Sequence, residues 1–308
     1  MTNLLLVTGV AGFIGRYVAR YFIEQGWSVV GTDNSPPENA PLANLKAYHR
    51  LQLPDPTLAT LIESYSPQVW IHCAGRASVA SSITDPASDF YGNALLTFEV
   101  LNTLRINAPQ CKFIYLSSAA VYGNPRSLPI SEDHLPSPIS PYGFHKLQGE
   151  QLCLEFSKVY GIATASARIF SAYGPGIRRQ VMWDICHKAI FQDSITLQGT
   201  GQESRDFIHA LEIAKALFII ANKAPMQGET YNLGTGVEVT ISELAELLLD
   251  ALDYQGSLKF DGKVSAGNPL NWQAEITKIQ TLGFQPEVPL KQGVRTFANW
   301  CRAELVGI

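Results

Sequence analysis

The stretch VTGVAGFIG, from Val7 to Gly15, lies between an apolar run and the first amphipathic segment of the chain. The run Leu4–Thr8 predicts a buried strand, and Phe13–Gln25 predicts a helix. The three glycines permit a tight turn, and the helix start offers N–H groups and a positive dipole end to a diphosphate. Their spacing is GxxGxxG rather than the standard GxGxxG, so ordinary turn chemistry is the competing interpretation. The stretch predicts a dinucleotide-binding turn.

An acidic residue follows at the distance that such a turn requires. Asp33 comes directly after the next predicted strand, Ser28–Thr32. An acid at this point hydrogen-bonds the ribose hydroxyls of NAD, whereas the 2′-phosphate of NADP would meet its negative charge. NAD is therefore the expected cofactor. The alternative is that Asp33 only forms a turn before Asn34.

Strands and helices alternate along the first half of the chain. Short apolar runs separated by longer amphipathic segments predict a Rossmann-type α/β fold with a doubly wound parallel sheet. Further strands are expected at Val69–Cys73, Lys112–Leu116 and Ile162–Phe170, and helices at Pro56–Tyr65, Pro86–Ile106 and Tyr142–Tyr160.

The pattern changes after Phe170, where turns rich in glycine and proline separate short elements. We expect an NAD-binding domain at residues 1–170, to which residues 207–235 return. The segment Phe207–Ile220 and the strand Thr230–Leu233 carry that return. Residues 171–206 and 236–308 are expected to form a smaller, discontiguous C-terminal substrate lobe.

Composition and charge exclude several classes of protein. A net charge of −4 provides neither a basic face for nucleic acid nor a polybasic tether for a membrane. Five scattered cysteines without a Cys-x-x-Cys pattern are typical of reduced thiols rather than of disulfides or a metal site. The chain lacks a signal peptide and any long apolar span, so we expect a cytoplasmic enzyme.

The pair Tyr142 and Lys146, four residues apart, lies on one face of a predicted helix. A phenol is a poor base at neutral pH, but a nearby cation lowers its pKa. Such a pair could move a proton to or from an alcohol. The pair alone is weak evidence, because a tyrosine ring packed over a lysine stem gives the same spacing.

The whole chain resembles the extended short-chain dehydrogenase/reductase family, in its NAD-dependent sugar-nucleotide epimerase/dehydratase branch. The motifs that carry the resemblance occur in the family's order: VTGVAGFIG, HCAGRASV, YLSSAAVYG, PYGFHK, RIFSAYGPG, GTGQESRDFIHA, YNLGTG and TLGFQP. The resemblance implies that Tyr142 transfers the proton, that Lys146 binds the nicotinamide ribose and lowers the phenol pKa, and that Ser118 hydrogen-bonds the reacting oxygen.

The resemblance also assigns residues to NAD. His72 resembles a residue beside the cofactor, but a satisfied core histidine is the preferred interpretation. Ser117 is expected to contact the cofactor or the backbone, and Asn93 matches a residue that is usually structural. The implied cofactor-binding set is Gly9, Gly12, Phe13, Ile14, Gly15, Asp33, Asn34, Ala74, Gly75, Arg76, Asn93, Ser117, Tyr142 and Lys146.

Departures from the family motifs narrow the reaction. Dehydratases of this branch carry Asp and Glu where this chain has Ala119 and Ala120, and the residues typical of decarboxylases and 3,5-epimerases are missing too. A 4-epimerase of UDP-hexose or UDP-hexuronate type is expected, with an NAD(P)H-dependent 4-keto-sugar reductase as the alternative. Asp33 favours the epimerase, because that enzyme retains NAD. A non-catalytic NAD(P)-binding regulatory protein is a third hypothesis.

The substrate side departs further from the family. Arg205 matches an arginine that holds the substrate diphosphate, with a salt bridge between lobes as the alternative. The usual Asn is Ser171 and a late Arg is Ser265, so Lys263, Arg178 or Arg179 would have to substitute. Trp272 falls where the C2 substituent of the sugar is selected, or packs between lobes. The implied substrate-binding set is Ser78, Ser171, Arg178, Arg205 and Trp272.

Oligomeric state is also implied by the resemblance. In the family a pair of helices forms a homodimer, and two predicted helices of this chain match that pair. Apolar faces on such helices are more often simply core. The matching residues are Leu96, Leu101, Leu104, Leu147, Leu154 and Phe156.

Overall fold

The structure is a computed structural model that describes residues 3–37, 43–263, 267 and 269–307. Ser265 and part of the Pro-rich segment after Asp33 lie outside these ranges. The main lobe is built on a seven-stranded parallel sheet in the order β11-β6-β5-β4-β1-β2-β3. The strands are β1 (Leu4–Thr8), β2 (Ser28–Asp33), β3 (Ala47–Arg50), β4 (Val69–His72), β5 (Lys112–Ser118), β6 (Thr164–Ile169) and β11 (Gln227–Leu233).

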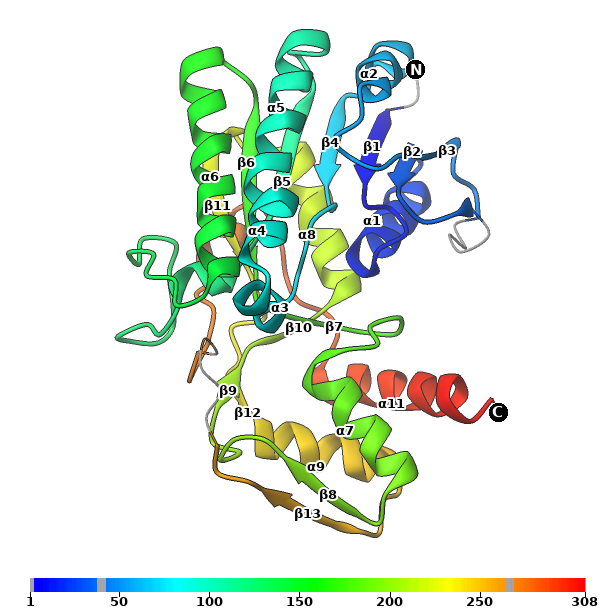
Figure 1. The fold of residues 1–308 in the computed structure, drawn as a ribbon, viewed down its shortest axis with the longest axis vertical. Helices are drawn as coiled ribbons and strands as arrows, with labels where there is room; N and C mark the ends of the chain where they lie inside the picture. Colours follow the sequence, from blue (N-terminus) through cyan, green and yellow to red (C-terminus); the bar gives the residue numbers. More distant parts are fainter. Residues whose placement is uncertain (1–2, 38–42, 264–266, 268, 308) are drawn as a thin grey trace.

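Helices cover both faces of this sheet (Figure 1). Leu5 and Val7 of β1 join the core under α1 (Phe13–Glu24) and α8 (Ala210–Lys223), whose apolar residues share one cluster. The alternate residues of β1 face the opposite cluster, which holds residues of α2 (Thr57–Tyr65), α5 (Leu96–Asn107) and α6 (Pro141–Tyr160). A strand buried on both faces needs apolar residues throughout. The predicted doubly wound parallel sheet is confirmed.

The predicted helix Pro86–Ile106 is helical throughout but contains a π turn. It begins as α4 (Pro86–Phe90), passes through a π-helical turn at Tyr91–Leu95, and continues as α5. Single π turns inside helices often occur at functional sites. This one places Asn93 in the buried interior. The preceding short helix α3 (Val79–Thr84) was not predicted, because its sequence VASSIT has too few apolar residues for a clear period.

The smaller lobe lies below the main sheet in Figure 1 and has its own apolar core. Its helices α7 (Gln180–Phe191), α9 (Ile241–Ala251) and α11 (Leu290–Val306) pack with a two-stranded parallel sheet of β8 (Ser194–Leu197) and β13 (Ser257–Phe260). The connecting elements are β7 (Ser171–Tyr173), β9 (Ser204–Arg205), β10 (Phe207–His209), β12 (Val239–Thr240) and α10 (Thr277–Thr281).

The chain crosses between the lobes more than once. After β10, helix α8 packs on α1 and β11 pairs with β6, so residues 210–233 complete the edge of the main sheet. Within the described residues, no helix is both long and apolar enough to span a bilayer.

Candidate active site

The glycine turn after β1 has no room for side chains. Gly9 has φ +75°, and a Cβ there would lie 2.6 Å from the backbone nitrogen of Ala74. A Cβ on Gly15 would lie 2.1 Å from the carbonyl oxygen of Gly9. Helix α1 then begins at Phe13 with no side-chain hydrogen bond at its N-cap, Gly12. The helix start therefore keeps its N–H groups and dipole available to an anion.

Asp33 ties this turn to the end of β2. Its Oδ2 accepts the N–H of Ala11 at 3.0 Å, and its Oδ1 accepts the N–H of Ser35 at 3.0 Å. Beside it, the side-chain amide of Asn34 donates to Gln52 at 3.2 Å. The carboxylate is half-buried next to the glycine turn, where a ribose would extend from a bound diphosphate.

Tyr142 is presented by the first turn of α6. The Ser140 hydroxyl caps the helix by accepting the N–H of Gly143 at 3.2 Å, and Pro141 opens the helix. The backbone N–H of Tyr142 donates to the buried hydroxyl of Ser82 at 3.1 Å. The phenol lies close enough to the Ser118 side chain, at the end of β5, for that hydroxyl to lower its pKa. The end of β5 and the first turn of α6 thus place the hydroxyls of Ser118 and Tyr142 beside each other.

Lys146 lies one turn further along α6. Its Nζ donates to the carbonyl of Leu116 at 2.9 Å and lies 5.8 Å from the centre of the Tyr142 ring. Burial lowers the pKa of Lys146 to about 8, against the opposing charge of Asp89. Burial raises the pKa of Tyr142, opposed by the nearby Ser118 hydroxyl and by the charge of Arg179. Burial thus sets the direction of the pKa of Tyr142 in this structure, and the lowering of that pKa by Lys146 stays a prediction.

An unsatisfied amide lies beside this group. Both side-chain polar atoms of Asn93 are buried without a hydrogen-bond partner in the described residues. A Cβ on Gly75 would lie 2.8 Å from Asn93 Oδ1 and 3.8 Å from Lys146 Nζ. Buried polar groups are normally paired, so an orphaned amide beside a bare glycine is a place where a polar ligand would be held.

A hollow of about 380 Å³ opens in the smaller lobe and carries two cations. Arg205 donates to the carbonyls of Ser204, Pro269 and Leu270, and its guanidinium lies 5.4 Å from the Trp272 ring centre. Burial lowers the pKa of Arg205 to about 10. The hollow is lined by Gln180, Val181, Asp184, Leu197, Gln198, Gly199, Glu203, Arg205, Lys263 and Pro269.

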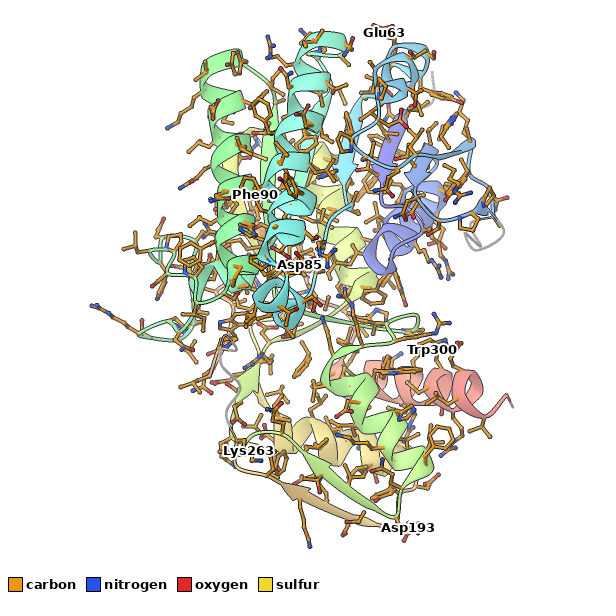
Figure 2. All side chains as sticks on the ribbon, viewed as in Figure 1. Glu63, Asp85, Phe90, Asp193, Lys263 and Trp300 are labelled. Carbon is orange, nitrogen blue, oxygen red and sulfur yellow. The ribbon has the colours of Figure 1, made fainter. Side chains whose placement is uncertain are left out.

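No ion pair joins Arg205 to a carboxylate among the described residues, so the alternative of a salt bridge between lobes is not observed. Lys263, labelled in Figure 2, lines the same hollow. The planar guanidinium of Arg205 and the ammonium of Lys263, at one hollow, are suited to binding a diphosphate.

Comparison with known proteins identifies the family. The model of the NAD dependent epimerase/dehydratase family matches residues 5–234. The chain belongs to this family. A putative UDP-glucose 4-epimerase of Methanocaldococcus jannaschii is 32% identical over 97% of this chain and 98% of its own length. The GDP-6-deoxy-D-mannose reductase of Pseudomonas aeruginosa is 29% identical over 97% and 98%.

A solved member of the NAD dependent epimerase/dehydratase family has nearly the same fold. The UDP-glucuronic acid 4-epimerase of Bacillus cereus, in complex with UDP-glucuronic acid and NAD, superposes with a TM-score of 0.89. It is 26% identical, and the match covers 98% of this chain and 99% of that one. The predicted family, enzyme class and NAD dependence are thereby confirmed.

NAD, the cofactor of the epimerase/dehydratase family, fits the residues present here. The bare glycine turn and the uncapped α1 match a diphosphate, and Asp33 matches an adenosine ribose. The orphaned amide of Asn93 lies beside Lys146, where the nicotinamide half would lie. Phe13 and Ile14 begin α1, and Ala74, Gly75 and Arg76 follow β4 at the same edge of the sheet.

The side chain of Ser117 is held by α6. Its side chain is buried, and its hydroxyl donates to Glu150 at 2.5 Å. Successive residues of a strand point to opposite faces, so Ser118 faces the site while Ser117 faces α6. The Ser117 hydroxyl is therefore occupied by Glu150, and a contact of Ser117 with the cofactor through its backbone stays a prediction. The sequence did not predict the hydrogen-bond network that includes Ser117, because the residues of that network are far apart in the sequence.

Arg178 does not reach the hollow. Its guanidinium pairs with Glu304 of α11 at 2.6 Å and lies 5.6 Å from the ring centre of Trp300, which is labelled in Figure 2. An exposed ion pair 126 residues apart cannot be read from sequence. The geometry gives no support to the predicted substrate contact of Arg178, which stays a prediction. The neighbouring Arg179 instead donates to the carbonyl of Ala77, across the lobes.

Trp272 is a packing residue. It is buried, its indole N–H donates to the carbonyl of Gly123 at 3.0 Å, and its ring meets Phe170 edge-on at 6.1 Å. The Arg205 guanidinium lies against its ring. Packing between the lobes therefore describes Trp272 better than selection of the C2 substituent of the sugar. Ser78 caps α3 by accepting the N–H of Ser81 at 3.1 Å, and Ser171 begins β7 in a half-buried position.

His72 is a satisfied core histidine, as preferred from sequence. It is buried, and Thr8 lies 2.7 Å from its Nδ1. Burial lowers the pKa of His72 to about 3, so the ring is neutral at physiological pH. Within the described residues, no cluster of three or more His, Cys, Asp or Glu side chains could hold a metal ion.

Proposed function

We propose that this protein is an NAD-dependent 4-epimerase of UDP-hexoses or UDP-hexuronates. The observation that carries the proposal is the placement of the Tyr142 phenol beside Ser118 and Lys146, at one end of a dinucleotide cradle. Ala119 and Ala120 follow Ser118 in a buried 3₁₀ turn, where they offer no acid or base. Tyr142 is thus the evident proton carrier, and simple hydride chemistry at one carbinol remains.

The residues divide the work in the following way. Tyr142 takes the proton from the C4 hydroxyl and returns it, while Ser118 holds that oxygen by a hydrogen bond. The Lys146 ammonium favours the phenolate during transfer, in a buried site where charge interactions are strong. NAD, when bound, supplies the hydride acceptor at C4. Loss and return of hydride on opposite faces of the 4-keto sugar inverts the carbon.

The substrate would span the two lobes. Arg205 and Lys263 bind its diphosphate in the hollow of the smaller lobe, and the sugar reaches from there to Tyr142. The structural relatives include an epimerase solved with UDP-glucuronic acid and one solved with UDP-glucose. These support a UDP sugar as the substrate class. Lys263 takes the place of the late arginine, whose position, Ser265, lies outside the described residues.

The test uses the purified protein and its Tyr142→Phe variant. We expect the wild type to retain stoichiometric NAD(H) through purification and to interconvert a UDP sugar with its C4 epimer. The variant should keep the cofactor and lose turnover. A variant with undiminished epimerisation would contradict the role of Tyr142.

A reductase is the second candidate, because the Pseudomonas aeruginosa relative is a GDP-6-deoxy-D-mannose reductase. A wild-type protein that emerges without cofactor, and that consumes added NADH with a 4-keto sugar nucleotide, would establish this alternative. The third hypothesis, a binding protein without turnover, would require that Tyr142→Phe leave the biological activity intact.

We further propose a cytoplasmic homodimer formed through the outer face of α4, α5 and α6. Two exposed aromatic side chains of this face pack on rings of α6: Phe90 meets the half-buried His145 at 5.5 Å, and Phe98 meets the buried Phe156 at 5.9 Å between ring centres. Phe90 is labelled beside α6 in Figure 2. The exposed apolar residues of this outer face are Phe90, Tyr91, Phe98, Ile106, Phe144, Leu154, Val159 and Tyr160. Five free cysteines favour a reducing compartment.

A further inference from the structure

Helix α6 carries a third polar residue in line with the reacting pair. Tyr142, Lys146 and Glu150 follow one another at intervals of four residues, so they share one face of the helix. Tyr142 and Lys146 face the proposed reaction centre. Glu150 is buried one turn beyond Lys146. A buried carboxylate is costly unless it is fully paired, so its partners need an explanation.

Those partners come from two neighbouring strands. The Ser117 hydroxyl of β5 donates to Glu150 Oε1 at 2.5 Å. Arg168 of β6 donates its Nε to Oε1 at 2.9 Å and its Nη2 to Oε2 at 2.7 Å. This bidentate geometry fixes orientation as well as distance. Glu150 therefore joins α6 to the residue beside Ser118 and to the next strand.

The network continues beneath the 3₁₀ turn that follows Ser118. Arg168 Nη1 donates to the Tyr122 hydroxyl at 2.8 Å, and that hydroxyl donates to Asn232 Oδ1 at 2.7 Å. The backbone N–H of Asn232 donates to Glu132 at 2.8 Å. Tyr122 ends the turn Ala119–Tyr122. The segment that carries Ser118 is thus held at both of its ends, by Ser117 and by Tyr122.

We propose that the Glu150–Arg168 pair positions Ser118 against Tyr142 for proton transfer. The carboxylate that holds Ser117 is on the same helix face as Tyr142, so β5 and α6 cannot slide past each other without breaking these bonds. Proton transfer needs heavy-atom distances of about 2.6–3.2 Å, which a small slip would destroy. The proposal rests on the proposed function, in that Ser118 and Tyr142 act on one oxygen.

Stability alone is a poor account of this pair. A buried ion pair contributes little net stability compared with well-packed apolar residues, because desolvation offsets its attraction. The pair lies behind the reacting groups, away from the hollow that carries Arg205. A positioning role therefore predicts a loss of kcat with little change in KM. A merely structural role predicts that activity falls only as far as the folded fraction does.

The first test compares Glu150→Gln and Ser117→Ala with the wild type. Ser117→Ala removes one hydrogen bond yet leaves Glu150 paired with Arg168. The proposal can therefore still be tested with this variant if Glu150→Gln fails to fold. We expect kcat to fall at least about ten-fold in Glu150→Gln and several-fold in Ser117→Ala. KM for the UDP sugar should change less than about two-fold, because ground-state binding is untouched. Retention of NAD is measured alongside.

Leu248→Ala is the control. Leu248 is fully buried in the core of the smaller lobe, and its truncation lowers stability without touching the network. Wild-type kcat per folded molecule in Leu248→Ala, with reduced kcat in Ser117→Ala, supports positioning. Wild-type kcat in Ser117→Ala, or equal losses in Leu248→Ala, overturns it.

The proposed function is tested separately on the wild type. A wild type that epimerises no UDP sugar overturns the proposed function. The same comparison of kcat and KM is then made for NADH-driven reduction of a 4-keto sugar nucleotide, which uses the same Tyr142 and Ser118. The two failures are therefore distinguishable.

Discussion

At the scale of single residues, one buried carboxylate supports the charge of Lys146 more than any other group. Asp89 is fully buried; its Oδ2 lies 2.6 Å from His145 Nδ1, and its Oδ1 has no hydrogen-bond partner in the described residues. Asp89 is the largest influence that raises the pKa of Lys146, against the burial that lowers it to about 8. The groups around Lys146 are Cys73, Asp89, Tyr115, Tyr142, Glu150 and Cys153.

Activity should therefore fall as pH rises through about 8, because Lys146 loses its proton there. In Asp89→Asn we expect the alkaline limb of kcat/KM to move down by about one pH unit, since a charge pair at an effective dielectric of ~20 is worth a few kcal/mol at most. In the unfolded chain this lysine stays protonated up to about pH 10.4. Between about pH 8 and pH 10.4 the unfolded state therefore binds more protons than the folded state, so the free energy of unfolding rises with pH. Thermal unfolding measured in parallel separates deprotonation from denaturation. An unmoved alkaline limb would refute the role of Asp89.

Two glycines of one turn make a matched pair. A Cβ on Gly15 would meet the Gly9 carbonyl at 2.1 Å, whereas one on Gly12 would lie 3.1 Å from it. We expect Gly15→Ala to destabilise the fold by about 2 kcal/mol, as overpacking against backbone does, and to release NAD. Gly12→Ala should cost less. Chemical denaturation and the NAD content of purified protein check both; equal effects would contradict the steric account.

Lys263 offers a test of the substrate hollow. If its ammonium binds the diphosphate in ground state and transition state alike, Lys263→Ala should raise KM for the UDP sugar about ten-fold and leave kcat unchanged, because a hydrogen bond to a charged group contributes about 1.5–3 kcal/mol. Lys259 of β13 is the control, since it is exposed and does not line the hollow. Steady-state kinetics that fail to separate the two variants would remove Lys263 from the site.

At the scale of elements, the start of α6 decides where Tyr142 lies. Ser140 caps this helix through a 3.2 Å bond to Gly143, and Thr240 caps α9 in the smaller lobe with a full capping box. Each cap contributes about 1 kcal/mol. We expect Ser140→Ala and Thr240→Ala to lower Tm by similar amounts, but only Ser140→Ala to lower kcat, by several-fold. Tm and kcat are measured for both variants. Equal kcat values in Ser140→Ala and Thr240→Ala would show that the Ser140 cap contributes to stability alone.

Elements were predictable from sequence where burial leaves a continuous pattern. The strands β1, β4 and β5 are buried on both faces, and their apolar runs are unambiguous. The edge strand β3 was missed, because Ala47–Arg50 is only half-buried and mixes polar with apolar residues. The π turn at Tyr91–Leu95 was missed because one extra residue per turn barely alters a helical period.

At the scale of the whole molecule, local motifs revealed the reacting residues but not their support. Tyr142, Lys146 and Ser118 were found because each lies in a short contiguous motif. The partners of Glu150 lie 18 and 33 residues away along the chain, and the ion pair of Arg178 with Glu304 spans 126. Such pairings arise from the topology of the sheet and the packing of helices, which one sequence does not display.

The proposed homodimer is a property of the whole molecule as well. If a second copy covers the outer face of α4, α5 and α6, a charge at its centre must be desolvated without a partner, which costs several kcal/mol. We expect Phe98→Lys to convert the dimer to monomer in analytical ultracentrifugation. Phe191→Lys is the control, because Phe191 is exposed at the end of α7 in the smaller lobe. Since Phe98 packs against Phe156 of α6, the monomer should also show weakened activity through movement of that helix. A wild type that sediments as a monomer, or a Phe98→Lys variant that remains dimeric, would contradict this interface.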